Sequence, residues 1–118
     1  MKIGIVGSRR RNLRCDWAKI YREFEQIYQP GDMIISGGCW AGGDRFAEEI
    51  AKKLQIPITI YYAAWYKLGK RAGMLRNGTI AKESDILIAC VALDRTGGTE
   101  DTIKKFKQFH PDGKLILC

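Results

Sequence analysis

The sequence has no long apolar run, and this shortage argues against a membrane protein. A membrane-spanning helix needs about 18 consecutive apolar residues, and no stretch of the chain approaches that length. The apolar start at residues 1–6 is also too short for the hydrophobic region of a secretion signal, and it runs directly into Gly7-Ser8-Arg9. We therefore expect a soluble, cytoplasmic protein with no membrane partner.

Histidine is scarce and the cysteines are scattered, which disfavours metal-binding and disulfide-rich classes. The cysteines, Cys15, Cys39, Cys90 and Cys118, form no C-x-x-C pair, whereas a tetrahedral metal site usually takes ligands in close pairs. His110 is the only imidazole, so any Ser-His-Asp or Cys-His arrangement would depend on it. We expect reduced, mostly buried thiols, with no bound metal and no other cofactor.

What the chain does have is an ordinary apolar content and an excess of positive charge. Apolar residues make up 46% of the 118, a share that argues against intrinsic disorder. The length fits one compact domain over residues 1–118. Twenty Lys and Arg against thirteen Asp and Glu give a formal charge of +7, which suits an anionic partner.

The apolar pattern switches repeatedly between strand-like runs and helical spacing. Strands are expected at residues 3–6, 33–35, 58–61, 86–90 and 114–117, and helices at 16–28, 44–54 and 99–109, with a loop running into a helix over 63–82. This alternation predicts an α/β fold, a Rossmann-like doubly wound parallel five-stranded sheet with helices on both faces. In such sheets ligands bind at the carboxyl ends of the strands, where the strand order reverses.

Two of the loops at that edge combine glycine with positive charge or with the start of a helix. Gly7, Ser8 and Arg9, followed by three more arginines, could offer backbone amides and guanidinium groups to a phosphate, or could form a solvated basic loop. The second loop, residues 36–44, has four glycines in seven residues, Gly37, Gly38, Gly42 and Gly43. Such a loop suits a close approach of backbone to a ligand, with Asp44 as a helix cap and Arg45 in the first turn.

The third and fourth loops extend the same pattern. In residues 64–77, Trp65 stands near Lys70 and other cations, which suits a nucleotide, although for Trp65 alone packing in the core is the favoured interpretation. The fourth loop brings Gly97 and Gly98 before a helix with Thr99 as the expected N-cap. Because glycine-rich turns and cations converge on one edge, an anionic ligand is the economical explanation.

Taken in order along the chain, these motifs resemble the SLOG superfamily, which joins the DprA/SMF proteins and the LOG phosphoribohydrolases, the latter often called lysine decarboxylases. The resemblance rests on Gly7-Ser8-Arg9, the 36–45 loop, the block from Trp65 to Asn77 and Gly97-Gly98-Thr99, and it is closest to the small YspA/cpYpsA-related branch. It implies a Rossmann-like fold that binds a nucleotide or nucleotide-derived ligand.

LOG enzymes are hydrolases that cleave the N-glycosidic bond of nucleoside 5′-monophosphates, and the resemblance carries this chemistry over in part. Arg76 occupies the position of their catalytic arginine, and Asn77 stands where they have lysine. Thr102 occupies the position of their glutamate, so Glu100 or Asp101 would have to replace it, although both acids also suit the positive end of a helix. The resemblance therefore implies Arg76, Glu100 and Asp101 as catalytic residues.

The expected ligand-binding residues are Gly7, Ser8, Arg9, Gly37, Gly38, Gly42, Gly43, Asp44, Arg45, Trp65, Lys70, Asn77, Gly97, Gly98 and Thr99. The alternative function is a non-enzymatic DprA-like module that binds single-stranded nucleic acid through its basic loops. LOG-like proteins commonly pair, so the resemblance also implies a homodimer or higher homo-oligomer.

Overall fold

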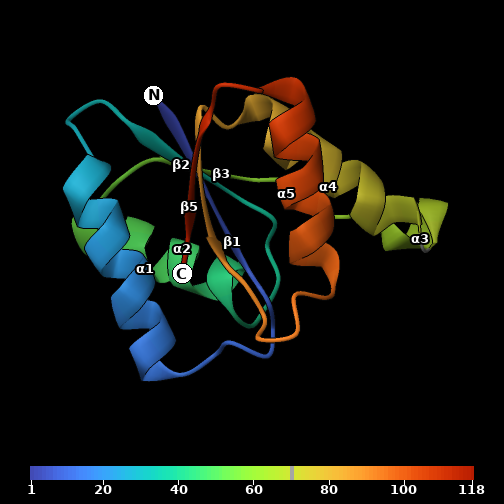
Figure 1. Ribbon diagram of the computed structural model, residues 1–118, viewed down its shortest axis with the longest axis horizontal. Coiled ribbons are helices and arrows are strands. Elements are labelled where there is room, and N and C mark those ends of the chain that lie inside the picture. Colours follow the sequence, from blue (N-terminus) through green and yellow to red (C-terminus); the bar gives the residue numbers. More distant parts are fainter. Residues whose placement is uncertain (70) are drawn as a thin grey trace.

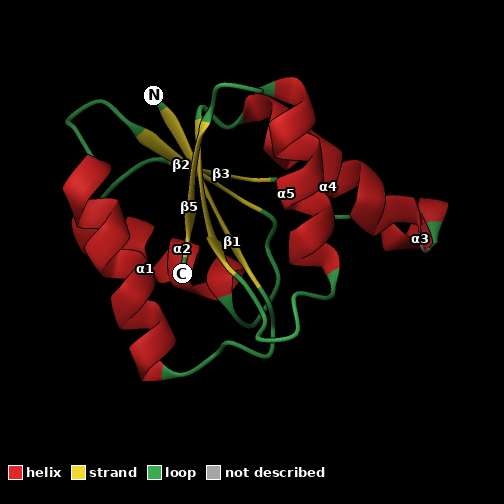
Figure 2. Ribbon diagram, viewed as in Figure 1, coloured by secondary structure: helices red, strands yellow, loops and turns green. Residues whose placement is uncertain are grey.

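A computed structural model describes residues 1–69 and 71–118, in which strands and helices alternate along the chain (Figures 1 and 2). The strands are β1 (Lys2–Gly7), β2 (Met33–Ser36), β3 (Ile58–Ile60), β4 (Ile86–Cys90) and β5 (Lys114–Leu117). The helices are α1 (Arg14–Ile27), α2 (Gly43–Leu54), α3 (Trp65–Leu68), α4 (Arg71–Glu83) and α5 (Gly98–Phe109). The expected α/β alternation is confirmed, and the expected 63–82 segment contains two helices, α3 and α4.

The five strands form one parallel sheet in the order β3-β2-β1-β4-β5. The chain first builds outward from β1 to β3 and then returns to lay β4 on the other side of β1. The reversal of strand order therefore falls between β1 and β4, whose pairing runs from Ile3 opposite Ile86 to Gly7 opposite Cys90. This point is where an open parallel sheet forms a crevice at its carboxyl edge.

Helices cover both faces of the sheet, as predicted (Figure 1). Alternate strand residues point to opposite faces, so each face has its own core. Ile3, Ile5 and Ile34 pack with the buried side chains of α1 and α2. Val6 and Ile35 pack with those of α4 and α5. The Rossmann-like architecture thus follows from strands that are apolar on both sides.

The start of α2 lies directly against β1, because Gly43 has no side chain. A Cβ atom built on Gly43 would stand 2.3 Å from the carbonyl carbon of Val6. The helix therefore begins at the carboxyl end of β1, and its first turn brings Asp44 to the same edge of the sheet.

Three local expectations are wrong. Thr99 and Asp44 are not helix caps, since α5 and α2 take Gly97 and Gly42 as N-caps, with no side-chain hydrogen bond at either cap. Both glycines have positive φ angles, 107° and 74°, and so begin their helices from a backbone conformation that glycine tolerates. The thiols are all free, but they are not mostly buried, since among the four only Cys90 is buried.

Among the described residues, none of the helices has the length and apolar content needed to cross a membrane.

Candidate functional site

A cavity of about 990 Å³ lies at the carboxyl edge of the sheet, over the reversal between β1 and β4. The loops that follow β1, β2 and β4 gather at one end of the sheet in Figure 2, and these loops line the cavity together with the segment after β3 and one side of α4. Its volume is in the range of small-molecule sites. The structure therefore brings the four predicted loops together around one hollow.

Most of the predicted site residues line this cavity. They are Gly7, Ser8, Arg9, Gly37, Gly38, Asp44, Trp65, Arg76, Asn77, Gly97, Gly98, Thr99 and Asp101. Four others, Gly42, Gly43, Arg45 and Glu100, are absent from the lining, and Lys70 lies outside the described residues. The binding and catalytic roles of these residues stay predictions.

Gly42 and Gly43 serve close packing instead of lining the cavity. A Cβ atom on Gly42 would lie 2.4 Å from the carbonyl oxygen of Ser8, and one on Gly43 would meet the backbone of β1. The glycines that could approach a ligand are thus the earlier pair of this loop, Gly37 and Gly38.

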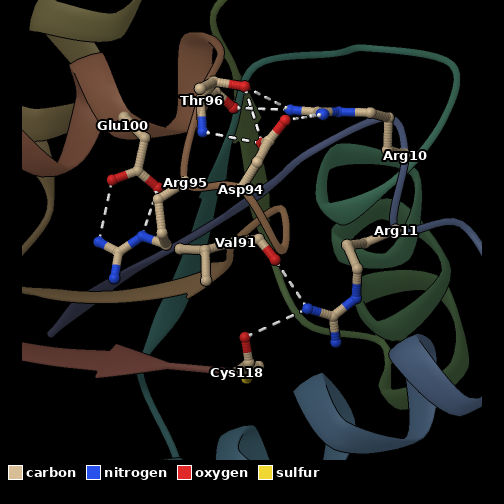
Figure 3. Close-up of polar contacts among 8 residues, drawn as sticks. All are labelled: Arg10, Arg11, Val91, Asp94, Arg95, Thr96, Glu100 and Cys118. Atoms are coloured by element: carbon tan, nitrogen blue, oxygen red, sulfur yellow. Dashed lines mark hydrogen bonds and ion pairs between the residues drawn. The ribbon is translucent and has the colours of Figure 1, made fainter.

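Arg45 and Glu100 point to other partners. The guanidinium of Arg45 donates from Nε to Asn12 Oδ1 at 3.0 Å and pairs with Glu49 at 2.7 Å. Glu100 accepts two hydrogen bonds from Arg95, at 2.8 and 2.9 Å (Figure 3). Of the two acids proposed to replace the LOG glutamate, only Asp101 lines the cavity.

A chain of polar contacts ties Arg76 to Asp101 along the cavity. Arg76 donates from Nη1 to the carbonyl oxygen of Gly37 and from Nε to Asn77 Oδ1 at 3.1 Å. The amide of Asn77 in turn donates to Asp101 Oδ2 at 3.2 Å, and Lys105 pairs with the same carboxylate oxygen at 3.0 Å. The lining residues from α4 and α5 are therefore held in place by one another.

Asp44 is a buried carboxyl group at the same place. Its Oδ2 accepts a hydrogen bond from the Cys39 N–H at 3.0 Å. Burial raises the pKa of Asp44 above its ordinary value, and the Cys39 N–H and the charge of Arg76 oppose that effect only in part. Gly37 leaves the room for both groups, since a Cβ there would lie 2.7 Å from Arg76 Nη1 and 2.9 Å from Asp44 Oδ2.

Aromatic rings form the opposite part of the lining, beside β2 and β3. Trp40, Tyr62 and Trp65 line the cavity although they are 78%, 70% and 57% exposed. The interpretation of Trp65 as a core anchor is wrong, because the ring lies over Gly73 at the cavity instead of in either core. An exposed aromatic face beside a cavity can stack on a flat ligand group.

Several lining residues escaped the sequence analysis as site residues. Arg10, Trp40, Tyr62, Gly73, Met74, Thr96 and Thr102 all line the cavity. Trp40 and Arg10 lie inside loops already singled out, and Tyr62 follows a predicted strand, so position at the carboxyl edge was the available signal. Met74 and Thr102 lie within helices, and only the way the helices pack brings them to the cavity.

Among residues 1–69 and 71–118, no three His, Cys, Asp or Glu side chains gather in a way that could hold a metal ion.

No protein-family model, no curated protein and no solved structure matches this chain.

Proposed function

We propose that the protein binds a nucleotide or nucleotide-derived ligand in the carboxyl-edge cavity, with the phosphate at the loops after β1 and β4. The observation that carries the proposal is the division of the cavity lining. Arg9, Arg10 and the start of α5, which lacks a side-chain cap, lie on the β1 and β4 side, while the exposed aromatic rings lie on the β2 and β3 side. A phosphate suits the first side and a base suits the second.

The start of α5 strengthens the phosphate half of this proposal. The first backbone N–H groups of a helix have no partner within the helix, and no side chain caps them here. Gly97, Gly98 and Thr99 from this turn all line the cavity. The helix end and the neighbouring arginine side chains together favour an anion. The resemblance to SLOG proteins supports the same assignment.

Calorimetry with AMP, GMP, CMP, UMP and ADP-ribose tests the proposal, with adenosine as the ligand without phosphate. We expect AMP to bind and adenosine to bind at least about tenfold more weakly, because charge-assisted hydrogen bonds to phosphate are lost. Arg9→Gln should weaken the binding of AMP by a similar factor. Arg22 is an exposed arginine on α1 outside the lining, so Arg22→Gln should leave the affinity for AMP unchanged. No heat and no thermal shift with any of these compounds would refute the proposal.

The aromatic half has its own matched pair of variants. Trp65→Ala should lower the affinity for AMP about tenfold, because a stacking surface for the base is lost. Tyr66 is the next residue, is 85% exposed and is absent from the lining, so Tyr66→Ala should leave the affinity unchanged. Equal losses in both variants would contradict stacking at Trp65.

Hydrolysis of the N-glycosidic bond is the second candidate function, favoured by the contact chain that joins Arg76 to Asp101 in the cavity. A carboxylate near the ribose could stabilise an oxocarbenium-like transition state. Release of free adenine from AMP measures the activity. Asp101→Asn should abolish it and Glu100→Gln should not, since Glu100 faces Arg95. Binding of AMP without release of adenine would leave the protein a binder only.

A further inference from the structure

We propose that Asp94 occupies the Arg10 guanidinium of this cavity as an internal counter-ion, which the phosphate of the ligand displaces. The inference rests on the proposed nucleotide site and adds how that site discriminates against anions that bind Arg10 more weakly than a phosphate monoester does. We call the contacts among Arg10, Asp94 and Thr96 the clasp (Figure 3).

The clasp joins the loop after β1 to the loop after β4. Arg10 donates from Nη1 to Asp94 Oδ2 at 2.8 Å. It also donates from Nη2 to the carbonyl oxygen and to the hydroxyl oxygen of Thr96, at 3.0 and 2.8 Å. Thr96 completes the ring, since its N–H and its hydroxyl donate to Asp94 Oδ1 at 3.2 and 2.8 Å. The Asp94 carboxylate thus accepts hydrogen bonds from a guanidinium, a hydroxyl and a backbone amide.

The same donors are of the kind that proteins direct at a phosphate group. Arg10 and Thr96 line the cavity, whereas Asp94 is absent from the lining. The guanidinium also passes beside Gly97, the N-cap of α5, with Nη2 4.0 Å from where a Cβ of Gly97 would stand. A cation therefore lies next to the positive end of a helix, and an anion placed there interacts favourably with both.

The exposure of the clasp makes an exchange of anions feasible. The side chains of Arg10 and Asp94 are 54% and 56% exposed, and ion pairs at such positions are weak. The hydrogen bond from Arg10, followed by that from Thr96, lowers the pKa of Asp94 to about 2, so the carboxylate stays charged at neutral pH. It competes with a ligand for Arg10 without being able to hold Arg10 firmly.

The competition sets which anions can enter. A phosphate monoester carries close to two negative charges and three acceptor oxygens, whereas the Asp94 carboxylate carries one charge. The monoester can take over both Nη groups of Arg10 and the Thr96 donors. A singly charged or neutral ligand gains too little to displace the carboxylate. The clasp thus favours a terminal phosphate over a carboxylate or a phosphodiester.

The test measures AMP affinity by calorimetry in Asp94→Asn, Arg10→Gln and the native protein, after circular dichroism has shown that each variant is folded. Asp94→Asn should increase the affinity for AMP about threefold, because the internal competitor loses its charge. Arg10→Gln should lower the affinity for AMP about tenfold. Glu83→Gln is the matched control, since it also removes one negative charge from a partly exposed ion pair, with Lys2, away from the cavity lining; we expect it to leave the affinity unchanged.

Each alternative outcome overturns a stated part. If the native protein binds AMP but Asp94→Asn binds no more tightly than Glu83→Gln does, the clasp is only a structural contact and the inference fails alone. If Asp94→Asn lowers the affinity for AMP, Asp94 positions Arg10 for the ligand, and the proposed competition between Asp94 and the phosphate is refuted. If neither the native protein nor Asp94→Asn binds any nucleotide of the panel, the proposed function fails and the inference fails with it.

Discussion

Two neighbouring arginines after β1 lie in opposite environments. Arg10 forms an exposed pair with Asp94 at the cavity, whereas the side chains of Arg11 and its partner Asp16 are 15% and 5% exposed. Arg11 donates from Nε to Asp16 Oδ1 at 2.6 Å and from Nη1 to the carbonyl oxygen of Val91 at 2.7 Å. One basic loop therefore supplies an exposed arginine, for which we propose an exchange of partners, and a buried arginine that helps to hold the fold together.

The largest expected effect comes from breaking the buried pair. Arg11→Gln should lower the free energy of unfolding by about 3 kcal/mol, because it leaves the Asp16 carboxylate with too few partners at a buried position. Urea denaturation measures the change. Arg14→Gln, an exposed arginine on the same segment, is the control and should stay close to the native protein. A loss below about 1 kcal/mol in Arg11→Gln would remove the contrast between the two arginines.

The buried pair of Arg11 and Asp16 should also make the stability of the protein depend on pH. Burial alone would raise the pKa of Asp16, but the hydrogen bonds from Arg11 and from the Leu13 N–H outweigh it and leave the pKa below its ordinary value. A carboxyl group lowered in this way stabilises the fold above its unfolded pKa of about 3.9, and that stability is lost as the pH falls through the folded value.

The melting temperature of the native protein should therefore fall as the pH decreases from about 4 toward 2. Arg11→Gln should show a smaller decline across this window, since its Asp16 has already lost the guanidinium, and Arg14→Gln, which replaces an exposed arginine, should follow the native curve. Identical declines in the native protein and Arg11→Gln would show that other carboxyl groups govern acid unfolding.

A salt titration with a single-stranded oligonucleotide tests the alternative function, binding of single-stranded nucleic acid, and compares Arg10 with Arg11 in that role. If the basic loops hold a nucleic acid, log K should fall linearly with log salt, by about 0.7 for each phosphate contacted. Arg10→Gln should then reduce the slope by about that amount, because Arg10 is exposed, whereas a folded Arg11→Gln should keep the native slope. Oligonucleotide binding that ignores salt would argue against this mode.

The smallest expected effect is that of Arg10→Gln on stability. Both partners of this ion pair are more than half exposed, so water replaces the lost contacts. We expect the urea midpoint to match that of the native protein within error. A clear loss would mean that the clasp fastens the two loops together and would weaken its assignment as a displaceable contact.

Much of the fold could be predicted from apolar periodicity. β4 and β5 have the predicted bounds, and the ends of the other strands and of α1, α2 and α5 lie within two residues of the predicted ones. The misses are local and have physical causes. Gly97 and Gly42 cap their helices because positive φ angles are needed at these positions, and this need outweighs the side-chain capping expected of Thr99 and Asp44.

The site was predictable at the level of loops but not of every side chain. The topology rule placed the loops at one edge, and Arg76, Asn77 and Asp101 meet there as the motifs suggested. The fates of Arg10 and Arg11 could not be read from the sequence. Arg10 pairs with Asp94, which lies 84 residues away in the chain. Arg11 pairs with Asp16, five residues away, but it also reaches the Val91 carbonyl oxygen, 80 residues away. Only the tertiary structure brings these distant partners near.

Arg11 has one more consequence, for how this chain behaves among its own copies. β5 is an edge strand, and Arg11 reaches from the loop after β1 to the carbonyl oxygens of Val91 and Cys118, at 2.7 and 3.4 Å (Figure 3). An unpaired strand edge is a template on which other molecules can add strands and aggregate. Because Arg11 holds the residue that follows β5, we expect the loss of Arg11 to free that end of the edge strand and to make its pairing with another copy easier.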